Sequence, residues 1–372
     1  MKHLRFLFFA AGAVALLAVT NVQARDLVYG SWLSPKHGIN MDALPPAFKG
    51  IEKDTNGAIK WKLVAGGQLV KGKNTLAGVK DGLVDAGLDI ALYAVKSTPS
   101  TALIFSTLVG GWDVVGATGA FVETDILHCP SCRAEYKRNN AVFLAGYATT
   151  PFRLMCRRKV STLAELKGKK VRSTGGGAIL IKNGGGIPVN ITPAEATTAL
   201  QRGGIDCVLG SAAWLKSYGY RDVAKHLLEY PLGMVGPPGS FTINRKTWKK
   251  MTEAQQKIHL KWMPRVVAES AINAYIMRER AIIKDAKGVG VTIHKAGPGF
   301  AKLFAAHEKA QRGRNIKRAT GWGVKDPAAI LDALDKARVK WKKISKEVGL
   351  DVAKFEAALK REIYDKVDLS KL

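Results

Sequence analysis

The sequence has few acidic residues. Asp and Glu number 30 against 58 Lys and Arg, so the 372-residue chain carries a formal net charge of +28. Such an excess favours polyanions, anionic surfaces and acidic small molecules, and does not choose among them. The basic residues are spread along the chain, are densest in stretches such as 336–346, and form no arginine-rich arm. We therefore interpret them as a solvated basic surface and expect no nucleic-acid partner.

Signatures of catalysis and of nucleotide binding are also missing. The sequence contains no HExxH and no GxSxG, and its seven histidines are scattered. The glycine-rich pieces 175–177 and 184–186 lack the Lys-Ser/Thr pair of a phosphate loop and the spacing of a dinucleotide fingerprint. We interpret both as flexible loops near a cleft, and we expect no cofactor, no metal and no ATP site. Nothing in the sequence argues for an enzyme.

Cysteine is scarce, and the four cysteines could pair in three ways in an oxidising compartment. They are Cys129, Cys132, Cys156 and Cys207. The segment Cys129-Pro-Ser-Cys132 is similar to a dithiol redox motif, but its neighbours lack the strand-then-helix pattern that such a motif needs. We expect a structural role, with Cys129 and Cys132 as a candidate disulfide. A periplasmic thiol oxidoreductase using these two cysteines is the main alternative function.

Long apolar runs are absent after the first residues. Lys2 and Arg5 precede an apolar run over 6–19, and small residues lead to Ala24. This is the pattern of a secretory signal peptide, so we expect 1–24 to be cleaved and the mature chain to be periplasmic. The next most apolar stretch, 64–95, is interrupted by several Lys and Asp residues and predicts no membrane span.

The remaining 348 residues (372 minus 24) exceed what one hydrophobic core usually organises, so we expect two domains. Apolar alternation and glycine stops predict strands and helices in the order β, α, β, α, β, which favours a wound α/β sheet. The expected ranges are 27–30, 41–55, 59–64, 74–81 and 86–90.

Capping boxes mark three later helix starts. Thr162 with Glu165, Thr192 with Glu195, and Thr252 with Gln255 have the required three-residue spacing. Strands are expected over 170–172 and 205–209, so a second α/β unit follows the first. From Thr252 onward the pattern predicts long helices, which continue past residue 277 and recur over 300–312 and 327–348.

Five segments in this order resemble the periplasmic receptors of tripartite ATP-independent periplasmic (TRAP) transporters, the DctP-like or C4-dicarboxylate receptor family. They cover most of the mature chain up to about residue 210. The segments are 27–32, DTNG at 54–57 with GGQL at 66–69, VKDGLVD at 79–85, LAELKGKKVR at 163–172, and ALQRGGID at 199–206.

The resemblance implies a two-domain periplasmic binding protein fold with a ligand cleft that closes between two wound α/β domains, braced by long C-terminal helices. We expect domain I to comprise 25–150 plus 239–282 and domain II to comprise 151–238 plus 283–372. The implied partners are a small organic acid and an ion-gradient-driven TRAP-type membrane permease. An ABC-type solute-binding protein would share the architecture and remains an alternative.

Arg172 ends a short strand and falls on the family's carboxylate-binding arginine, whose planar guanidinium can bind a carboxylate through two parallel hydrogen bonds. Some members have a second ligand-facing arginine about 20 residues earlier, which Arg153 matches only with a one-residue gap. Trp32 and Gly210 replace a polar residue and an asparagine of a sialic-acid-binding member, which argues against sialic acid. The other candidate ligand contacts are Trp32, Tyr93 and Trp214, and burial in a domain core is an equally good interpretation of each. The two tryptophans favour a ligand with apolar or aromatic surface.

Overall fold

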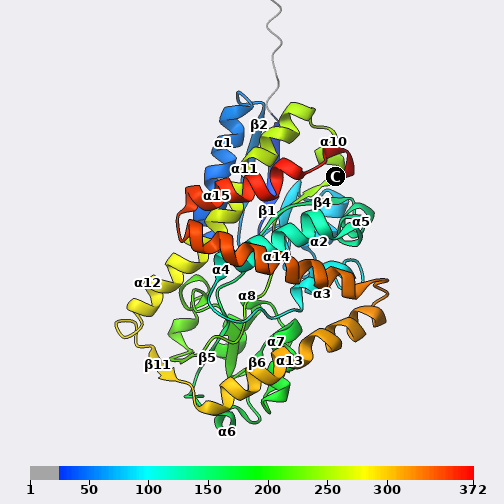
Figure 1. Ribbon diagram of the computed structural model, residues 1–372. Coiled ribbons are helices and arrows are strands. Elements are labelled where there is room, and N and C mark those ends of the chain that lie inside the picture. The colour runs from blue at the N-terminus through cyan, green and yellow to red at the C-terminus, as the bar shows by residue number, and fades with distance from the viewer. Residues whose placement is uncertain (1–24) are drawn as a thin grey trace, which may run out of the picture.

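The computed structural model describes residues 25–372, so the expected signal peptide lies outside the described residues. Two β-sheets, each covered by helices, are stacked along the long axis of the molecule (Figure 1). This is the expected two-part α/β architecture. We call the five-stranded sheet with its helices lobe I, and the six-stranded sheet with its helices lobe II.

The sheet of lobe I has the strand order β2-β1-β3-β10-β4. β1 runs parallel to β2 and β3, whereas β10 is antiparallel to both of its neighbours. The sheet is therefore mixed, and its fourth strand comes from a segment far along the chain. The bounds are β1 Arg25–Gly30, β2 Ile59–Val64, β3 Ala86–Asp89, β4 Ala141–Gly146 and β10 Gly239–Asn244.

The sheet of lobe II has the order β11-β9-β5-β8-β6-β7 and is also mixed. β5 is antiparallel to β8 and β9, and β6 is parallel to β7 and β8. The bounds are β5 Arg153–Cys156, β6 Lys170–Arg172, β7 Ile187–Val189, β8 Cys207–Gly210, β9 His226–Glu229 and β11 Thr292–Lys295.

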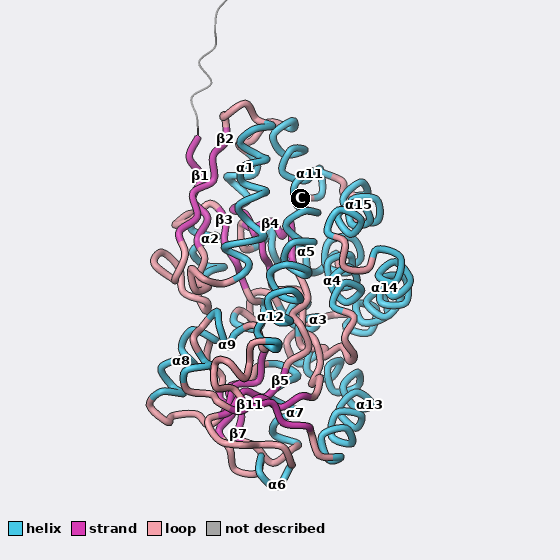
Figure 2. Tube along the Cα trace, turned by 90° about the vertical axis from the view of Figure 1, so that its left-hand side faces the viewer, coloured by secondary structure: helices cyan, strands magenta, loops and turns pink. Residues whose placement is uncertain are grey.

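The helices surround both sheets (Figure 2). Among residues 25–372, no helix is long and apolar enough to cross a membrane. The bounds are α1 Leu44–Asp54, α2 Thr75–Asp81, α3 Pro99–Phe105, α4 Val114–Glu123, α5 Pro130–Arg138, α6 Leu163–Leu166, α7 Gly175–Asn183, α8 Pro193–Gln201, α9 Trp214–Ser217, α10 Arg245–Lys249, α11 Glu253–Ala271, α12 Arg278–Lys284, α13 Pro298–Gly321, α14 Pro327–Val348 and α15 Val352–Glu362.

The three predicted capping boxes are confirmed. The side chains of Thr162, Thr192 and Thr252 each accept a hydrogen bond from the backbone amide three residues later. In return, the Glu or Gln side chain at that position accepts one from the backbone amide of the threonine. The long helix after Thr252 continues as expected, through α11, the π-helical segment η5 (Ile272–Met277) and α12. Wider turns in η5 leave the chain helical where it passes between the lobes.

The interpretation of 175–177 as a flexible loop is wrong, because these glycines form the first turn of α7. A Cβ at Gly176 would lie 2.5 Å from the Ser106 carbonyl oxygen, and one at Gly177 would lie 2.8 Å from the Leu209 side chain. The glycines therefore permit close packing of α7 against neighbouring segments. Their sequence pattern alone did not distinguish close packing from flexibility.

Two extended segments connect the lobes side by side. The first crossing segment (147–152) joins β4 to β5, and the second (230–238) joins β9 to β10. The amides of Thr149 and Phe152 donate to the carbonyls of Val235 and Gly233 at 3.0 and 2.8 Å. These hydrogen bonds hold the two crossing segments together, so the lobes are joined by one paired connection.

The C-terminal helices return to lobe I. α14 packs on α4 and α15 packs on α11. The buried indole of Trp341 on α14 occupies the space that a Cβ at Gly119 of α4 would need, and its Nε1 donates to Glu123 at 2.6 Å. For the division into domains, we propose that residues from about 327 onward belong with lobe I rather than with lobe II.

The four cysteines form two disulfides, Cys129 with Cys132 and Cys156 with Cys207. Cys129 caps the N-terminus of α5, and the second disulfide joins the neighbouring strands β5 and β8. All four residues are buried in the core. Their placement supports a structural role.

Candidate functional site

A narrow cavity of about 40 Å³ lies where the two lobes meet the crossing segments. We call it the cleft cavity. Eight aromatic side chains make up half of its lining, with Arg172 as its charged group. The aromatic residues are Trp32, Tyr93, Phe105, Tyr147, Phe152, Trp214, Tyr218 and Tyr275.

Arg172 reaches the cavity because it is the last residue of β6, whose register with β7 and β8 fixes its backbone. Only 3% of the residue is exposed. Its Nε donates to the Ile191 carbonyl at 2.9 Å, its Nη1 to the Leu209 carbonyl at 3.4 Å, and its Nη2 to the Tyr93 hydroxyl at 3.2 Å. These partners orient the guanidinium but carry no negative charge.

No carboxylate of residues 25–372 forms an ion pair with Arg172. Glu195, whose pKa is affected in small part by Arg172, already accepts hydrogen bonds in the capping box of α8. Burial alone would raise the pKa of Glu195, but the bonds from Thr192 hold it below its ordinary value. Buried charges in proteins are normally paired, because an isolated one is costly to desolvate. The cleft cavity therefore contains a cation that lacks a counter-charge.

Tyr93 and Trp32 enter the cavity from lobe I. The Trp32 indole donates to the Leu88 carbonyl at 2.8 Å, and its ring lies edge-on to Tyr93 with centroids 6.3 Å apart. Burial raises the pKa of Tyr93, against the opposing effect of Arg172. Tyr93 is thus a neutral hydroxyl that accepts from Arg172 and keeps its own proton available for a ligand oxygen.

Trp214 enters from lobe II, at the start of α9. The Arg172 guanidinium lies 5.4 Å from the centroid of its ring, a cation–π contact. A Cβ at Gly210 would lie 2.1 Å from the same ring, so the glycine makes room for the indole. The buried Nε1 of Trp214 makes no well-formed hydrogen bond with the described residues, although it interacts with the nearby Tyr275 hydroxyl. It is therefore a weakly engaged donor beside the cation.

Arg153 does not lie in the cleft cavity. Phe152 lines it, whereas Arg153, the next residue, faces the opposite side of the crossing segment and pairs with Glu279 at 3.2 Å. Successive side chains of extended backbone point to opposite faces, so a one-residue gap in the match moves the residue to the other side. The structure thus brings together Arg172, Trp32, Tyr93 and Trp214, and leaves Arg153 out.

Sequence reasoning missed five of the aromatic residues: Phe105, Tyr147, Phe152, Tyr218 and Tyr275. Tyr147 and Phe152 belong to the first crossing segment, and Tyr275 belongs to η5. They meet only because distant parts of the chain cross between the lobes. No local sequence signal marks these five residues as neighbours.

The groups around the cleft cavity indicate which kind of ligand it can bind. The nearest histidine, His37, packs against the rings of Tyr218 and Tyr275, and burial lowers its pKa to about 3, so it is neutral. Residues 25–372 contain no group of three or more His, Cys, Asp or Glu side chains placed to hold a metal ion. A cation with two neutral donors beside an aromatic wall matches an organic carboxylate.

The sequence matches a family of solute-binding proteins and is similar to a periplasmic binding protein. Residues 34–311 match the family DctP, described as bacterial extracellular solute-binding protein, family 7. The chain is also 26% identical over 225 residues to the monocarboxylate 2-oxoacid-binding periplasmic protein of a Nostoc species. That match covers 56% of this chain and 57% of the relative, so it spans little more than half of the relative's length.

Two solved structures illustrate the shared fold. A TRAP solute-binding protein from Rhodoferax ferrireducens, in complex with copurified benzoate, has a TM-score of 0.75 at 17% identity, over 87% of this chain and all of that one. A TRAP periplasmic solute-binding protein from Bordetella bronchiseptica, with bound mandelate, has a TM-score of 0.72 at 23% identity, over 86% of this chain and 99% of that one.

Proposed function

This chain belongs to family 7 of the bacterial extracellular solute-binding proteins, and from that premise we propose that it is a periplasmic receptor for an organic carboxylate. The ligand occupies the cleft cavity, and Arg172 binds its carboxylate. The receptor then delivers the ligand to an ion-gradient-driven TRAP-type permease. The expected cleavage after Ala24 would release the receptor into the periplasm.

One observation carries the assignment to a carboxylate. Arg172 is buried, is oriented by three neutral acceptors, and has no acidic partner among residues 25–372. A ligand carboxylate supplies the missing charge and accepts two parallel hydrogen bonds from the guanidinium. A neutral sugar would leave the cation unpaired, which argues against sugars as ligands.

The aromatic wall narrows the ligand class to carboxylates with an apolar or aromatic body. A dicarboxylate would bring a second negative charge toward Trp32, Phe105 and Phe152, which offer it no cation. The Trp214 Nε1, which makes no well-formed hydrogen bond in the free protein, and the Tyr93 hydroxyl can donate to one carboxylate or to a neighbouring hydroxyl or oxo group. Two proteins of similar fold whose structures contain benzoate and mandelate support a carboxylate with an aromatic body.

The alternative function, a thiol oxidoreductase, has little support. The sulfur atoms of Cys129 and Cys132 are joined in a disulfide, and both residues are fully buried in lobe I. A reactive dithiol needs an accessible thiolate for exchange with its substrate. We therefore propose that the chain is a receptor without enzymatic activity.

Thermal-shift measurements with an acid panel test the proposed function. Benzoate, mandelate and a 2-oxo acid should raise the melting temperature of the mature protein, since a ligand at 100 times its Kd stabilises by about 2.7 kcal/mol. Succinate should do so less, and glucose should have no effect. Stabilisation by neutral sugars with none by any carboxylate would reject the proposal.

A further inference from the structure

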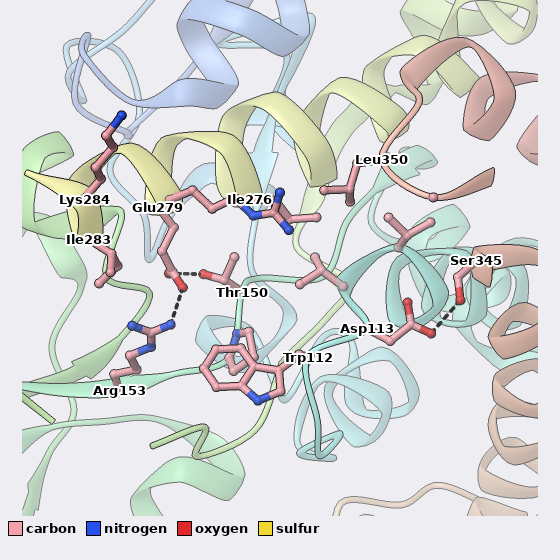
Figure 3. Close-up of a pocket in the computed structure, with 15 residues that line it drawn as sticks. Trp112, Asp113, Thr150, Arg153, Ile276, Glu279, Ile283, Lys284, Ser345 and Leu350 are labelled. Atoms are coloured by element: carbon pink, nitrogen blue, oxygen red, sulfur yellow. Dashed lines mark hydrogen bonds and ion pairs between the residues drawn. The ribbon is translucent and has the colours of Figure 1, made fainter. Parts of the chain in front are cut away.

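A second and larger cavity, of about 520 Å³, lies on the other side of the first crossing segment. We call it the hinge cavity (Figure 3). Its walls come from lobe I at Trp112 and Leu350, from the crossing segment at Thr150, and from η5 and α12 at Ile276 and Lys284. It therefore sits where the segments that connect the lobes converge.

The two cavities share one wall. Tyr147, Thr149 and Phe152 line the cleft cavity, whereas Thr150 and Arg153 line the hinge cavity. The same holds in the helix, where Tyr275 faces the cleft cavity and Ile276 faces the hinge cavity. A change in backbone angles along these segments consequently reshapes both cavities.

Both carboxylates that line the hinge cavity already have partners. Glu279 accepts from the Thr150 hydroxyl at 2.5 Å, from the Ser211 hydroxyl at 3.0 Å and from the Ala212 amide at 2.9 Å, besides its pair with Arg153. Figure 3 shows it between Thr150 and Arg153. Asp113 accepts from the Gly116 amide and from the Ser345 hydroxyl, at 2.8 and 2.7 Å.

The cations of the hinge cavity outnumber these carboxylates. Arg280 and Lys284, exposed on α12, form no ion pair with any residue of 25–372. Arg153 is 94% buried, and its Nε has no hydrogen-bond partner there, although its Nη2 pairs with Glu279. The cavity therefore has uncompensated positive charge, which favours an anion.

The remaining lining is apolar and open to solvent. Trp112 is 53% exposed and Leu350 is 37% exposed, and both are among the few large apolar residues of the described chain that face solvent. The Arg153 guanidinium stacks on the Trp112 ring at 4.9 Å from its centroid. Exposed apolar surface gathered in a concave site is typical of ligand binding.

We propose that the hinge cavity is a second binding site, for an organic anion with an apolar body, separate from the cleft cavity. The anionic group lies between Arg280 and Lys284, and the apolar body lies on Trp112, Ile276 and Leu350. Because elements of both lobes form the site, occupancy of the hinge cavity changes the affinity of the cleft cavity, and the reverse holds by linkage. The site itself does not depend on Arg172 or on the identity of the cleft ligand.

Fluorescence titration with 8-anilinonaphthalene-1-sulfonate, an aromatic sulfonate, tests the site on the mature protein. We expect saturable binding. The double variant Arg280→Glu, Lys284→Glu should weaken it by at least about tenfold, because two attractive charges become repulsive. Trp112→Ala should weaken it by a similar factor through loss of the apolar wall.

The matched control is Lys343→Glu with Lys346→Glu. It makes the same change in net charge at exposed positions of α14 that line neither cavity. Its affinity for the dye should stay within about twofold of the parent, as expected for screened surface charges. If the control loses as much affinity for the dye as the α12 double variant does, the change in net charge alone explains both losses. That result would overturn the proposal.

A further variant separates the two cavities. Arg172→Ala removes the cation of the cleft cavity but no residue that lines the hinge cavity, so dye binding should remain saturable, with an affinity within a few-fold of that of the parent. Loss of dye binding in folded Arg172→Ala would place the dye in the cleft cavity and reject the second site. Absence of saturable binding to the parent protein would also reject it. Failure of the carboxylate panel in the thermal-shift test would leave this result standing, since the two experiments probe different cations.

Discussion

The Arg172 guanidinium of lobe II donates a hydrogen bond to the Tyr93 hydroxyl of lobe I, with 3.2 Å between Nη2 and the hydroxyl oxygen. This bond spans the cleft cavity. It ties the charged group that we propose for carboxylate binding to the opposite wall, so Arg172 is held in place from both lobes. The residue that we propose for ligand recognition is therefore also one that links the two lobes.

Tyr93→Phe should weaken ligand binding several-fold and lower the stability of the free protein. The variant leaves Nη2 of Arg172 without its acceptor and removes a donor from the cavity, and a lost hydrogen bond of this kind costs about 0.5 to 1.5 kcal/mol. Calorimetry with benzoate measures the affinity. Tyr230→Phe, at a tyrosine that lines neither cavity, is the control and should bind as the parent does. Unchanged affinity in Tyr93→Phe would exclude the hydroxyl from the site.

Trp214→Phe should reduce ligand affinity without a matching loss of hydrogen bonds in the free protein. The parent Nε1 has only an interaction with the Tyr275 hydroxyl that falls short of a well-formed hydrogen bond, so its removal should cost the free protein less than it costs the complex. We expect an affinity loss of up to about tenfold by calorimetry. Trp322→Phe, an indole outside both cavities, controls for general effects. Affinity equal to that of the parent would mean that the indole contacts the ligand only through its ring.

Glu279→Gln should destabilise the protein strongly. The Glu279 carboxylate accepts from Arg153, from Thr150 and from the Ala212 amide, just before α9, in a buried network between the lobes. Breaking a buried pair by neutralising one partner typically costs about 3 to 5 kcal/mol, which urea unfolding measures. The control is Glu253→Gln, whose pair with Lys257 is exposed and should contribute little to stability. Equal losses in the two variants would contradict a bracing role for Glu279.

Ionisation of the buried Asp89 carboxyl should make the protein less stable as the pH rises from 4 to 7. Burial raises its pKa to about 6 from an ordinary value of 3.8, despite hydrogen bonds from Thr242 and Tyr136. The folded state thus favours the protonated form. Its contribution to stability is complete below pH 3.8 and is lost as the pH passes 6, a difference on the order of 3 kcal/mol.

The variant Asp89→Asn should therefore have a flatter dependence of unfolding free energy on pH between 4 and 7 than the parent. Urea unfolding at several pH values measures the slope, with the exposed Asp365→Asn as the control. A slope in Asp89→Asn equal to that of the parent would show that Asp89 does not titrate differently on folding.

Local features of the fold were predictable because local residues determine them. The capping boxes at Thr162, Thr192 and Thr252 need only two side chains three residues apart, and Arg172 ends its strand as its neighbours indicate. The return of β10 to the sheet of lobe I depends on contacts between distant segments, so no local pattern marks it, and the expectation that 239–282 belongs to domain I came only from the family resemblance.

Some residues that line the cleft cavity were predictable from local sequence. Arg172 belongs to a segment whose resemblance to the family is continuous, so its position transferred without a gap. Arg153 did not transfer, because in extended backbone a shift of one residue reverses the face and exchanges Phe152 for Arg153. The aromatic wall required knowledge of how the crossing segments meet η5, which is a property of the assembled lobes.

Affinity of Arg172→Lys for the best carboxylate of the acid panel, measured by calorimetry on folded protein, tests the central claim most directly. Lysine keeps the charge but lacks the planar fork that binds a carboxylate in two parallel hydrogen bonds. We predict a loss of about 2 to 5 kcal/mol, or roughly 30-fold to several thousand-fold in Kd, while the surface variant Lys343→Ala binds as the parent does. Affinity of Arg172→Lys within about threefold of the parent would contradict the account, because the carboxylate would then be bound elsewhere.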